Sequence, residues 1–489
     1  MTPLKEIFNT NLALLTDLYQ ITMAYGYWKS GIIERDSVFN MFFRKNPFSG
    51  GYAVACGLHD VIDYLDSYHF DESDLAYLAT LKGNDDKLLF ESAFLDYLRN
   101  MKFSCTVHAI PEGTIVFPHE PLLRIEGPLF QCQMVETAIL NMINFQTLIA
   151  TKSSRMRVAA KDETVLEFGL RRAQGVHGAL AASRAAYIGG CDSTSNVLAG
   201  KIYDIPVRGT HAHSWVMSFD NELEAFEAYA DAMPNNCVFL VDTYDTLEGV
   251  KNAIIVGNKL KAKGHHFNGI RLDSGDLAYL SIEARKLLDE AGFEDTAIVA
   301  SNDLDEHLIE SLHQQGAKIS VWGIGTKLVT GDSQPALGGV YKLAAIKDEH
   351  GNWQYKVKLS EQAIKVSTPG IQQVRRFFNG NDCIGDMIYD ELNPPQEEML
   401  IVDPMDLTRR KAMPPNTPFK DLLVKIFDNG KLVYQKPTVH ESRKKTLFEL
   451  ETIHKSVKRF ANAHAYPVGL EKGLFDMKTN LILKLRHLE

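Results

Sequence analysis

The central part of the chain alternates short, apolar, β-rich runs with longer helical stretches. The strand-like runs cover residues 165–168, 238–241, 269–272, 297–300 and 319–322. Helical patterns follow them, for example at 246–263 and 276–291. Parallel strands joined by helical crossovers are the simplest arrangement for this alternation. Asp242 and Asp273 lie roughly 30 residues apart, about one βα unit. We therefore expect an α/β protein with an irregular, TIM-like β/α barrel.

Polar residues gather where each of these strands should end. They are Arg171, Thr210, His213, Asp242, Arg271, Asp273, Asn302, Asp303, Gly323 and Thr326. In β/α barrels the carboxyl ends of the strands build the active site. The sequence therefore predicts one polar site at this edge of the barrel.

The two ends of the chain mix helices and strands. Before the barrel we expect a helix at 16–29, strand-like runs at 38–44 and 52–58, three helical stretches, and a strand-like run at 103–110. We divide the chain into an N-terminal α+β segment at 1–124, a barrel at 125–346 and a C-terminal segment at 347–489. The first and last segments are expected to form a second α+β domain together.

The C-terminal segment carries two local signals. Two apolar runs, at 422–427 and 431–434, are joined by Asp428-Asn429-Gly430, and Asn-Gly between such runs predicts a β-hairpin. Apolar residues then recur at helical spacing from Leu450 to Phe460, which predicts an amphipathic helix. We interpret its basic face as solvated surface.

Composition excludes several kinds of partner. The chain has 489 residues, 45% hydrophobic and 23% charged, which is typical of a globular protein too long for one simple core. Its formal charge of -10 provides no basic field for a nucleic acid backbone. A protein of this charge that handles anionic metabolites must concentrate arginines, lysines and glycine-rich turns in one place.

The cysteines and the N-terminus indicate a reducing, cytoplasmic location. The six cysteines are Cys56, Cys105, Cys132, Cys191, Cys237 and Cys383. They show no Cys-x-x-Cys pair or short Cys/His spacing, so we expect free thiols and no metal site built from protein ligands alone. The sequence contains no apolar stretch of about 18 residues and no signal peptide pattern, so we expect neither membrane insertion nor secretion.

The common nucleotide-binding and hydrolase motifs do not occur in this sequence. The run at 207–219 is distinctive, because a strand-like segment leads into Gly209-Thr210, two histidines and a serine at the start of a helix. Taken alone, His213 fits a structural or surface histidine as well as a functional one.

Seven blocks of the sequence, in order, resemble the nicotinate phosphoribosyltransferase family. They are Thr16-Asp17-Leu18-Tyr19-Gln20; Phe42-Phe43-Arg44 with Pro47-Phe48; Glu167-Phe168-Gly169-Leu170-Arg171-Arg172-Ala173-Gln174-Gly175; Gly209-Thr210-His211-Ala212-His213-Ser214; Val241-Asp242-Thr243-Tyr244-Asp245; Ile270-Arg271-Leu272-Asp273-Ser274-Gly275-Asp276; and Gly323-Ile324-Gly325-Thr326. Seven ordered matches between residues 16 and 326 are hard to obtain by chance.

The resemblance implies a reaction of NAD synthesis. Nicotinate and 5-phosphoribosyl 1-diphosphate would give nicotinate mononucleotide and pyrophosphate, with ATP hydrolysis coupled through a phosphohistidine. The implied sugar transfer passes through an oxocarbenium-like state, so catalysis depends on holding the pyridine nitrogen against C1 while Mg²⁺ neutralises the leaving pyrophosphate. ATP and Mg²⁺ are therefore the expected cofactors.

By the resemblance, His213 is the phosphorylated histidine. Imidazole suits this role because its neutral nitrogen is nucleophilic near neutral pH. Asp242 would bind the other ring nitrogen and fix the tautomer, with capping of the following helix as the alternative role.

The resemblance also assigns the pyridine pocket. Phe168 and Tyr19 would sandwich the ring, with Tyr19 supplied by the neighbouring subunit of a homodimer, although either aromatic could instead be core. Arg271 would bind the nicotinate carboxylate with help from Thr210, or else form an ion pair with Asp273. Asp273 would contact the ribose hydroxyls or the metal-bound diphosphate, with a buried structural carboxylate as the alternative.

A phosphate site is expected around Gly323, Gly325 and Thr326, whose backbone N–H groups and hydroxyl could face the 5′-phosphate. A tight turn is the alternative. Arg171 would be a second phosphate ligand or a surface salt bridge. We expect His211 to line the pocket or support it, and assign no role to Lys327.

Two other functions remain open. A related transferase would use nicotinamide or quinolinate, and dependence on Arg271 would distinguish a carboxylate substrate from a neutral amide. A non-catalytic sensor of phosphoribosyl compounds would not need the complete set of His213, Asp242, Arg271, Asp273 and Thr326.

Overall fold

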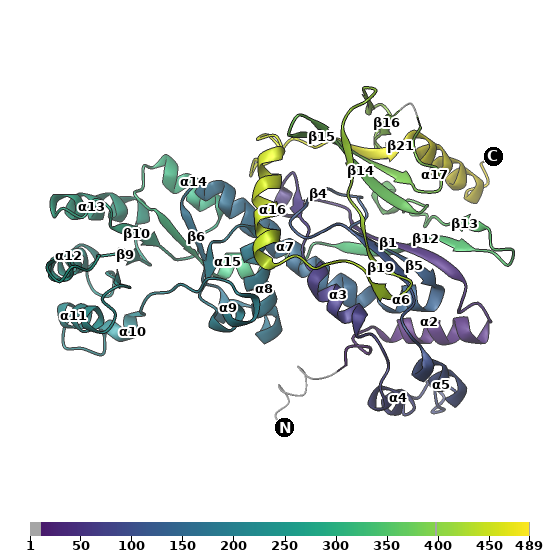
Figure 1. Cartoon of the computed structure of the whole chain (residues 1–489), viewed down its shortest axis with the longest axis horizontal. Coiled ribbons are helices and arrows are strands. Elements are labelled where there is room, and N and C mark those ends of the chain that lie inside the picture. The colour runs from purple at the N-terminus through teal and green to yellow at the C-terminus, as the bar shows by residue number, and fades with distance from the viewer. Residues whose placement is uncertain (1–10, 397–398, 489) are drawn as a thin grey trace. The chain divides into compact units, whose positions relative to one another are not determined.

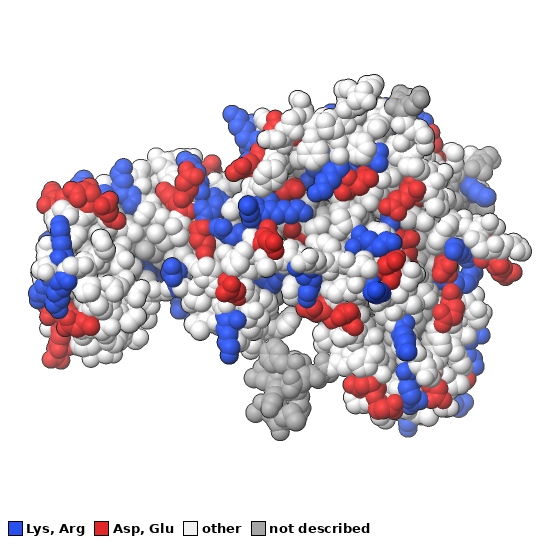
Figure 2. Space-filling model, viewed as in Figure 1, with Lys and Arg blue, Asp and Glu red and all other residues white. Residues whose placement is uncertain are grey.

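The computed structural model describes residues 11–396 and 399–488. The chain forms two compact units. The central unit comprises Leu148–Pro335 and Thr438–Leu447, and the flanking unit comprises Met1–Thr147, Ala336–Pro437 and Phe448–Glu489. Within the described residues, no helix is long and apolar enough to cross a membrane. On the face seen in Figure 2, cationic and anionic side chains are interspersed.

The central unit is built on a sheet of six parallel strands in the order β7-β6-β11-β10-β9-β8. Figure 1 labels β6, β9 and β10 of this sheet. The strands are β6 (Thr164–Glu167), β7 (Ser193–Thr194), β8 (Val238–Leu240), β9 (Gly269–Leu272), β10 (Ala297–Ala300) and β11 (Val321–Ile324). A single parallel bridge adds Val207 beside Thr194. The predicted α/β class, an irregular β/α barrel with a second α+β domain, is confirmed.

Helices follow these strands along the chain. The helices of the central part are α7 (Glu136–Ala160), η2 (Leu170–Arg172), α8 (Gly175–Gly189), α9 (Val197–Tyr203), α10 (His213–Val216), α11 (Glu222–Ala232), α12 (Thr246–Ala262), α13 (Leu277–Glu290), α14 (Glu306–Gln314) and α15 (Thr326–Val329). Three of them begin at an aspartate, because Asp245, Asp276 and Asp305 each accept a backbone N–H from the first turn of α12, α13 and α14. These caps fix where each strand-to-helix loop ends, and the loops carry the polar residues of the site.

The flanking unit contains antiparallel structure drawn from both ends of the chain. Its seven-stranded sheet has the order β13-β12-β1-β5-β3-β19-β20. These strands are β1 (Asp36–Phe43), β3 (Thr106–Ala109), β5 (Leu123–Pro128), β12 (Gly339–Lys347), β13 (Trp353–Tyr355), β19 (Val424–Asp428) and β20 (Lys431–Leu432). The core of this unit packs buried aromatic and aliphatic side chains of these strands against its helices.

A second sheet of the flanking unit has the order β17-β16-β21-β15-β14-β18, and β2 pairs with β4. The strands are β2 (Ala53–Val54), β4 (Ile115–Val116), β14 (Gln372–Asn379), β15 (Asp382–Asp390), β16 (Met399–Val402), β17 (Arg410–Met413), β18 (Phe419–Asp421) and β21 (Val468–Glu471). The helices of the flanking unit are α2 (Leu18–Lys29), η1 (Pro47–Ser49), α3 (Leu58–Asp66), α4 (Glu72–Leu78), α5 (Ser92–Asn100), α6 (Leu129–Met134), η3 (Ala363–Lys365) and α17 (Lys472–Leu485). The remaining helix, α16 (Val439–Thr452), begins in the central unit and ends in the flanking unit.

The compact units divide the chain differently from the ranges drawn on the sequence. Residues 125–147 and 336–346 group with the flanking unit, whereas the sequence-based division placed them in the barrel. Strand pairing gives the reason. Both β5 and β12 pair with β1, which belongs to the flanking unit.

Several local predictions can be compared with the structure. The hairpin across Asn429 and Gly430 is confirmed, and both residues have positive φ, 47° and 79°, as a tight turn requires. The strand expected at 52–58 is limited to Ala53–Val54. The helix expected up to Phe460 is wrong beyond Thr452, where α16 ends and the chain continues in turns. Apolar residues three or four positions apart can be buried along successive turns as well as along a helix, so this spacing alone does not distinguish the two.

Candidate active site

A cavity of about 360 Å³ opens at the carboxyl ends of the parallel strands in the central unit. Eight of the residues given a catalytic or substrate-binding role from the sequence line it, namely Phe168, Arg171, Thr210, Arg271, Asp273, Gly323, Gly325 and Thr326, and the predicted His211, Asn302 and Asp303 line it as well. They come from the carboxyl ends of different strands and from the segments that follow them, as expected for the active edge of a β/α barrel. His213 and Asp242 are not among the lining residues, but each lies next to Asp273, which is; Tyr19 belongs to the flanking unit.

The turn after β6 is held by the buried carboxylate of Glu167. Its Oε1 accepts the N–H of Gly169, and its Oε2 accepts the hydroxyls of Ser183 at 2.8 Å and Thr194 at 2.5 Å. Glu167 is fully buried, so these bonds replace the water that an ionised group would need. These hydrogen bonds therefore hold in place the start of the turn that carries Phe168 and the following arginines.

Phe168 lies directly against Gly323 of β11 and against Gly325, which follows that strand. A Cβ atom added to Gly323 would come within 2.8 Å of Phe168 Cδ2 and Cε2. A Cβ on Gly325 would lie 3.3 Å from the carbonyl oxygen of Phe168. Gly323 therefore lets the aromatic ring pack on the strand, a requirement separate from the predicted role in phosphate binding.

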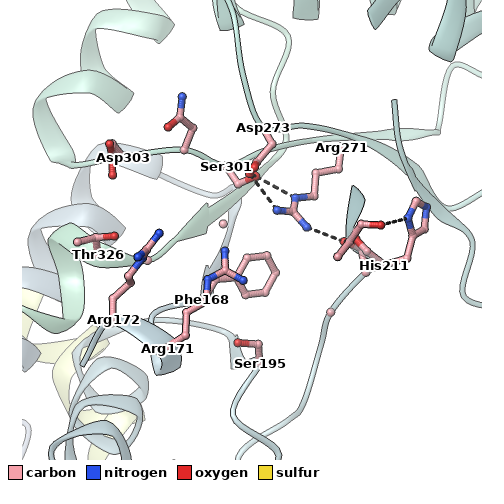
Figure 3. A pocket seen from close by; sticks show the side chains of 16 residues that line it. Phe168, Arg171, Arg172, Ser195, His211, Arg271, Asp273, Ser301, Asp303 and Thr326 are labelled. Carbon is pink, nitrogen blue, oxygen red and sulfur yellow. Dashed lines mark hydrogen bonds and ion pairs between the residues drawn. The ribbon is translucent and has the colours of Figure 1, made fainter. Parts of the chain in front are cut away.

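Arg171 and Arg172 extend from η2 into the cavity (Figure 3). Within the described part of the chain, neither side chain has an ion pair or a hydrogen bond, so Arg171 does not form the surface salt bridge considered from the sequence. Two adjacent guanidinium groups without a protein counter-ion are suited to an anion with several oxygens. The sequence interpretation assigned no role to Arg172, although it sits beside Arg171 in the same block.

Arg271 makes a closed set of bonds on the other side of the cavity (Figure 3). Its Nε donates to Ser301 Oγ, its Nη1 to Thr210 Oγ1 and its Nη2 to Asp273 Oδ1, each at 2.9 Å. The guanidinium carbon also lies 5.9 Å from the centre of the Phe168 ring. The ion pair with Asp273, considered as the alternative role of Arg271, is thus formed in the structure.

Asp273 is held in its ionised form. Burial alone would raise its pKa, but the Ser301 hydroxyl and the Arg271 guanidinium outweigh burial and hold the pKa of Asp273 below its usual value. Ser301 thus joins the arginine and the aspartate. The sequence interpretation missed Ser301, and its position directly after β10 was the available signal.

The surroundings of His213 differ from the sequence prediction. Its Nδ1 lies 3.2 Å from Thr243 Oγ1, and its Nε2 lies 3.9 Å from Asp273 Oδ2. Asp242 does not hold the histidine as predicted, because its Oδ2 accepts the backbone N–H of Asp273 at 3.0 Å and the hydroxyl of Ser274 at 2.5 Å. Asp242 therefore positions the loop that carries Asp273, and Thr243 takes the place next to the ring.

The alternative role of Asp242 as a helix cap is also wrong. Asp245 caps α12 by accepting the backbone N–H of Glu248 at 2.9 Å. Asp242 Oδ1 is buried and has no hydrogen-bond partner among the residues that the structure describes. A buried, unsatisfied carboxylate oxygen this close to the cavity is costly unless another group meets it.

His211 lines the cavity, as expected. Its Nε2 accepts the backbone N–H of Leu240 at 3.2 Å, which leaves the proton on Nδ1. Burial, supported by the nearby charges of Arg271 and His213, lowers the pKa of His211 to about 4. His211 is therefore a neutral wall residue at physiological pH.

Lys327 connects two loops around the cavity. Its Nζ donates to Asp305 Oδ2 at 2.7 Å, and this bond raises the pKa of Lys327. Asp305 follows Asn302 and Asp303, which line the cavity and have positive φ values of 95° and 26°. Lys327 thus fastens this strained loop to the start of α15.

Tyr19 lies in α2 of the flanking unit and is 51% exposed. An exposed aromatic ring on a helix is available to a partner, and its predicted place in a neighbouring subunit's site stays a prediction. Within the described residues, no group of three or more His, Cys, Asp or Glu side chains could hold a metal ion.

Comparisons with known proteins cover nearly the whole chain. Family models for the N-terminal domain, the family itself and the C-terminal domain of nicotinate phosphoribosyltransferase (NAPRTase) match residues 14–144, 164–355 and 371–478. The Bacillus subtilis nicotinate phosphoribosyltransferase is 45% identical over 97% of this chain and 96% of its own length. The human nicotinate phosphoribosyltransferase is 34% identical over 96% of each sequence. The crystal structure of human nicotinic acid phosphoribosyltransferase superposes with a TM-score of 0.83, at 33% identity, over 95% of this chain and 99% of that one.

Proposed function

Because the chain belongs to the nicotinate phosphoribosyltransferase family, we propose that it joins nicotinate to 5-phosphoribosyl 1-diphosphate and releases nicotinate mononucleotide and pyrophosphate. The observation that supports this best is that one cavity holds Arg271 beside Phe168 together with Arg171 and Arg172, which have no counter-ion among the described residues. The reaction would be the first step of NAD synthesis from nicotinate, in the cytoplasm.

Nicotinate would bind at the Arg271 end of the cavity. A guanidinium has five N–H donors, and three of them already donate to Ser301, Thr210 and Asp273. The remaining two can take the nicotinate carboxylate while the pyridine ring packs on Phe168. Because the network holds Arg271 before substrate arrives, little side-chain entropy remains to be lost on binding.

The phosphoribosyl substrate would bind between Arg171, Arg172 and the start of α15. The 5′-phosphate would meet Thr326 and the backbone of the Gly323 to Gly325 turn, and the arginines would bind phosphate oxygens. Arg171 and Arg172 lie one residue after another on η2, so both can reach one multiply charged ligand. This placement would hold C1 of the ribose near the pyridine nitrogen, which is the main requirement of the reaction.

The cavity also fits a magnesium–diphosphate complex. Mg²⁺ is usually bound by one or two carboxylates together with substrate phosphates, and Asp273 and Asp303 both line the cavity. When bound, the ion would neutralise charge on the leaving pyrophosphate. Asp273 stays ionised because its pKa is lowered, so it is ready for the ribose hydroxyls or the metal.

ATP hydrolysis would be coupled through His213. With the ring proton on Nδ1 and donated to the Thr243 hydroxyl, the lone pair of Nε2 would attack the γ-phosphorus of ATP. The N–P bond forms as the bond to the β-phosphate oxygen breaks, and ADP leaves. A phosphate on Nε2 would stand close to the Asp273 carboxylate, now 3.9 Å away, and repel it. Through Asp273 the new charge would act on Arg271 and thus on the nicotinate site.

The site would be completed in a homodimer. Tyr19 of the neighbouring subunit would cover the face of the pyridine ring opposite Phe168. Its exposure in the single chain is consistent with this role.

The test is mass spectrometry of purified protein after treatment with ATP and Mg²⁺, with formation of nicotinate mononucleotide measured with and without ATP. We expect acid-labile phosphate on His213 and ATP-stimulated product, both lost in His213→Ala. Formation of product without phosphohistidine would support the transferase activity but reject ATP coupling through His213. If neither product nor phosphohistidine forms, the result would favour a sensor of phosphoribosyl compounds. If a parallel assay shows preference for nicotinamide or quinolinate, that pyridine would replace nicotinate as the proposed substrate.

A further inference from the structure

A second cavity, of about 600 Å³, lies in the flanking unit and is rich in cations. It borders β17 and the turns that precede β21. We call it the basic groove, defined by Arg409, Arg410, Lys411 and Arg459. Asp403 is the one carboxylate among its described lining residues. In a chain with a net charge of -10, four cations against one anion is a marked local excess.

The cations of the basic groove are poorly neutralised by the protein. In the described part of the chain, Arg459 has neither an ion pair nor a side-chain hydrogen bond, and Arg410 donates only to the carbonyl oxygen of Leu407, at 3.2 Å. Arg409 lies 3.6 Å from Asp406, but both side chains are largely exposed, so this pair contributes little. The three arginines of the groove therefore keep N–H donors that can bind an anion.

Lys411 adds a partly buried ammonium group to the basic groove. Its Nζ donates to the carbonyl oxygen of Ile384 rather than to a carboxylate. Burial lowers the pKa of Lys411. An anion in the groove would compensate the cost of removing this ammonium group from water. By contrast, the buried guanidinium of Arg376, in the same unit, is paired with Asp386.

A smaller apolar cavity of about 230 Å³ adjoins the basic groove, and the two share Asp403, Ala465, Tyr466 and Val468 as lining residues. The rings of Phe117 and Tyr466 stack there, with centres 4.0 Å apart and planes 10° apart. A ring system attached to an anion could enter this cavity while its charged part lies in the groove.

We propose that the basic groove is a binding site for a small phosphate-bearing anion, separate from the cavity of the central unit. Arginines at this density bind phosphate oxygens through charge-assisted hydrogen bonds, and an ammonium group adds a point charge. The site does not depend on the proposed reaction, because none of its residues belongs to the central unit. Binding here would make the protein responsive to a phosphorylated metabolite.

The source of the phosphate is either free pyrophosphate or a nucleotide. Both are tested by calorimetric titration of the full chain carrying Arg171→Ala and Arg172→Ala, which weakens anion binding in the central cavity. We expect saturable binding of pyrophosphate or ATP at one site per chain. Tighter binding of ATP would identify a nucleotide with its base in the apolar cavity, and equal or tighter binding of pyrophosphate would identify free polyphosphate.

Adding Arg410→Ala and Arg459→Ala should weaken this binding about tenfold or more, because two charge-assisted bonds are lost. Lys425→Ala is the matched control, since Lys425 is an exposed cation of the same unit already paired with Asp428. An isotherm unchanged by Arg410→Ala and Arg459→Ala would reject the site. If that protein fails to fold, the unsubstituted chain still tests it, because pyrophosphate should protect Arg410 and Arg459 from modification by phenylglyoxal. Equal modification with and without pyrophosphate would also reject the site.

Discussion

The arginines at the two ends of the central cavity stand in different environments. Arg271 donates to Ser301, Thr210 and Asp273, so its position is set before any ligand binds. Arg171 and Arg172 line the same cavity without an ion pair among the described residues. The first end is built for orientation of a ring and its carboxylate, and the second for attraction of a multiply charged group. Substitutions at the two ends should therefore change different kinetic constants.

Arg271→Ala should have the largest effect. It removes the carboxylate ligand and also leaves Asp273, Thr210 and Ser301 without their shared donor. We expect kcat/KM for nicotinate to fall about 100-fold or more, because a site built around a polar partner loses heavily when the partner is absent. Steady-state kinetics measure this, with Arg271→Lys as a variant that keeps the charge but not the planar fork. An unchanged KM for nicotinate would show that Arg271 does not bind this substrate.

Arg171→Ala and Arg172→Ala should each raise the KM for 5-phosphoribosyl 1-diphosphate about tenfold and leave the KM for nicotinate nearly constant. Arg208→Ala is the matched control, since Arg208 is an exposed arginine of the same unit bonded to the carbonyl of Val207. The effect should shrink at high salt because exposed charges are screened. A parallel rise in both KM values would show that the two ends are not separate.

The sequence predicted the strands and loops of the central cavity well. Five of the six parallel strands coincide with predicted apolar runs, whereas β7 (Ser193–Thr194) is polar and was not predicted. A position at the carboxyl end of a strand or in the loop after it is sufficient to bring residues such as Thr210, Arg271 and Asp273 to one edge. The family resemblance then separated Phe168 and Arg171 from ordinary core and surface residues.

Pairings between side chains could not be predicted in the same way. The partner of His213 depends on the direction of each side chain at the end of β8, and the structure places Thr243 rather than Asp242 next to the ring. Long-range pairing also limited the domain ranges, because residues 336–346 were assigned to the barrel, whereas β12 within them pairs with β1 of the flanking unit. Local sequence patterns indicate which residues are buried and whether they repeat with a helix or strand period, but not which distant strand pairs with a given strand.

Gly323→Ala should have an intermediate effect confined to the ring end. The added methyl group would lie 2.8 Å from the Phe168 ring and must displace it. We expect the KM for nicotinate to rise about fivefold with little change in the KM for the phosphoribosyl substrate, since aromatic contacts of this kind contribute about 1 kcal/mol. Gly178→Ala is the control, because a Cβ at Gly178 meets nothing within 4 Å. If instead the phosphoribosyl KM rises alone, Gly323 serves the phosphate as predicted from the sequence.

The bond between Lys327 and Asp305 should give the smallest effect, because it fastens the wall of the phosphate end without facing the ligand itself. Lys327→Met removes the bond from one side. Asp305→Asn removes the negative charge from the other side. The side-chain oxygen that remains can still accept the backbone N–H of Leu308 and so cap α14. We expect each variant to raise the KM for 5-phosphoribosyl 1-diphosphate about threefold, in keeping with a partly exposed ion pair. If the bond acts by joining the two loops, the double variant should be no worse than either single one, because the same interaction is lost once. Effects that multiply in the double variant would mean that Lys327 and Asp305 act on the substrate separately, and that the two walls of the phosphate end are held by other contacts.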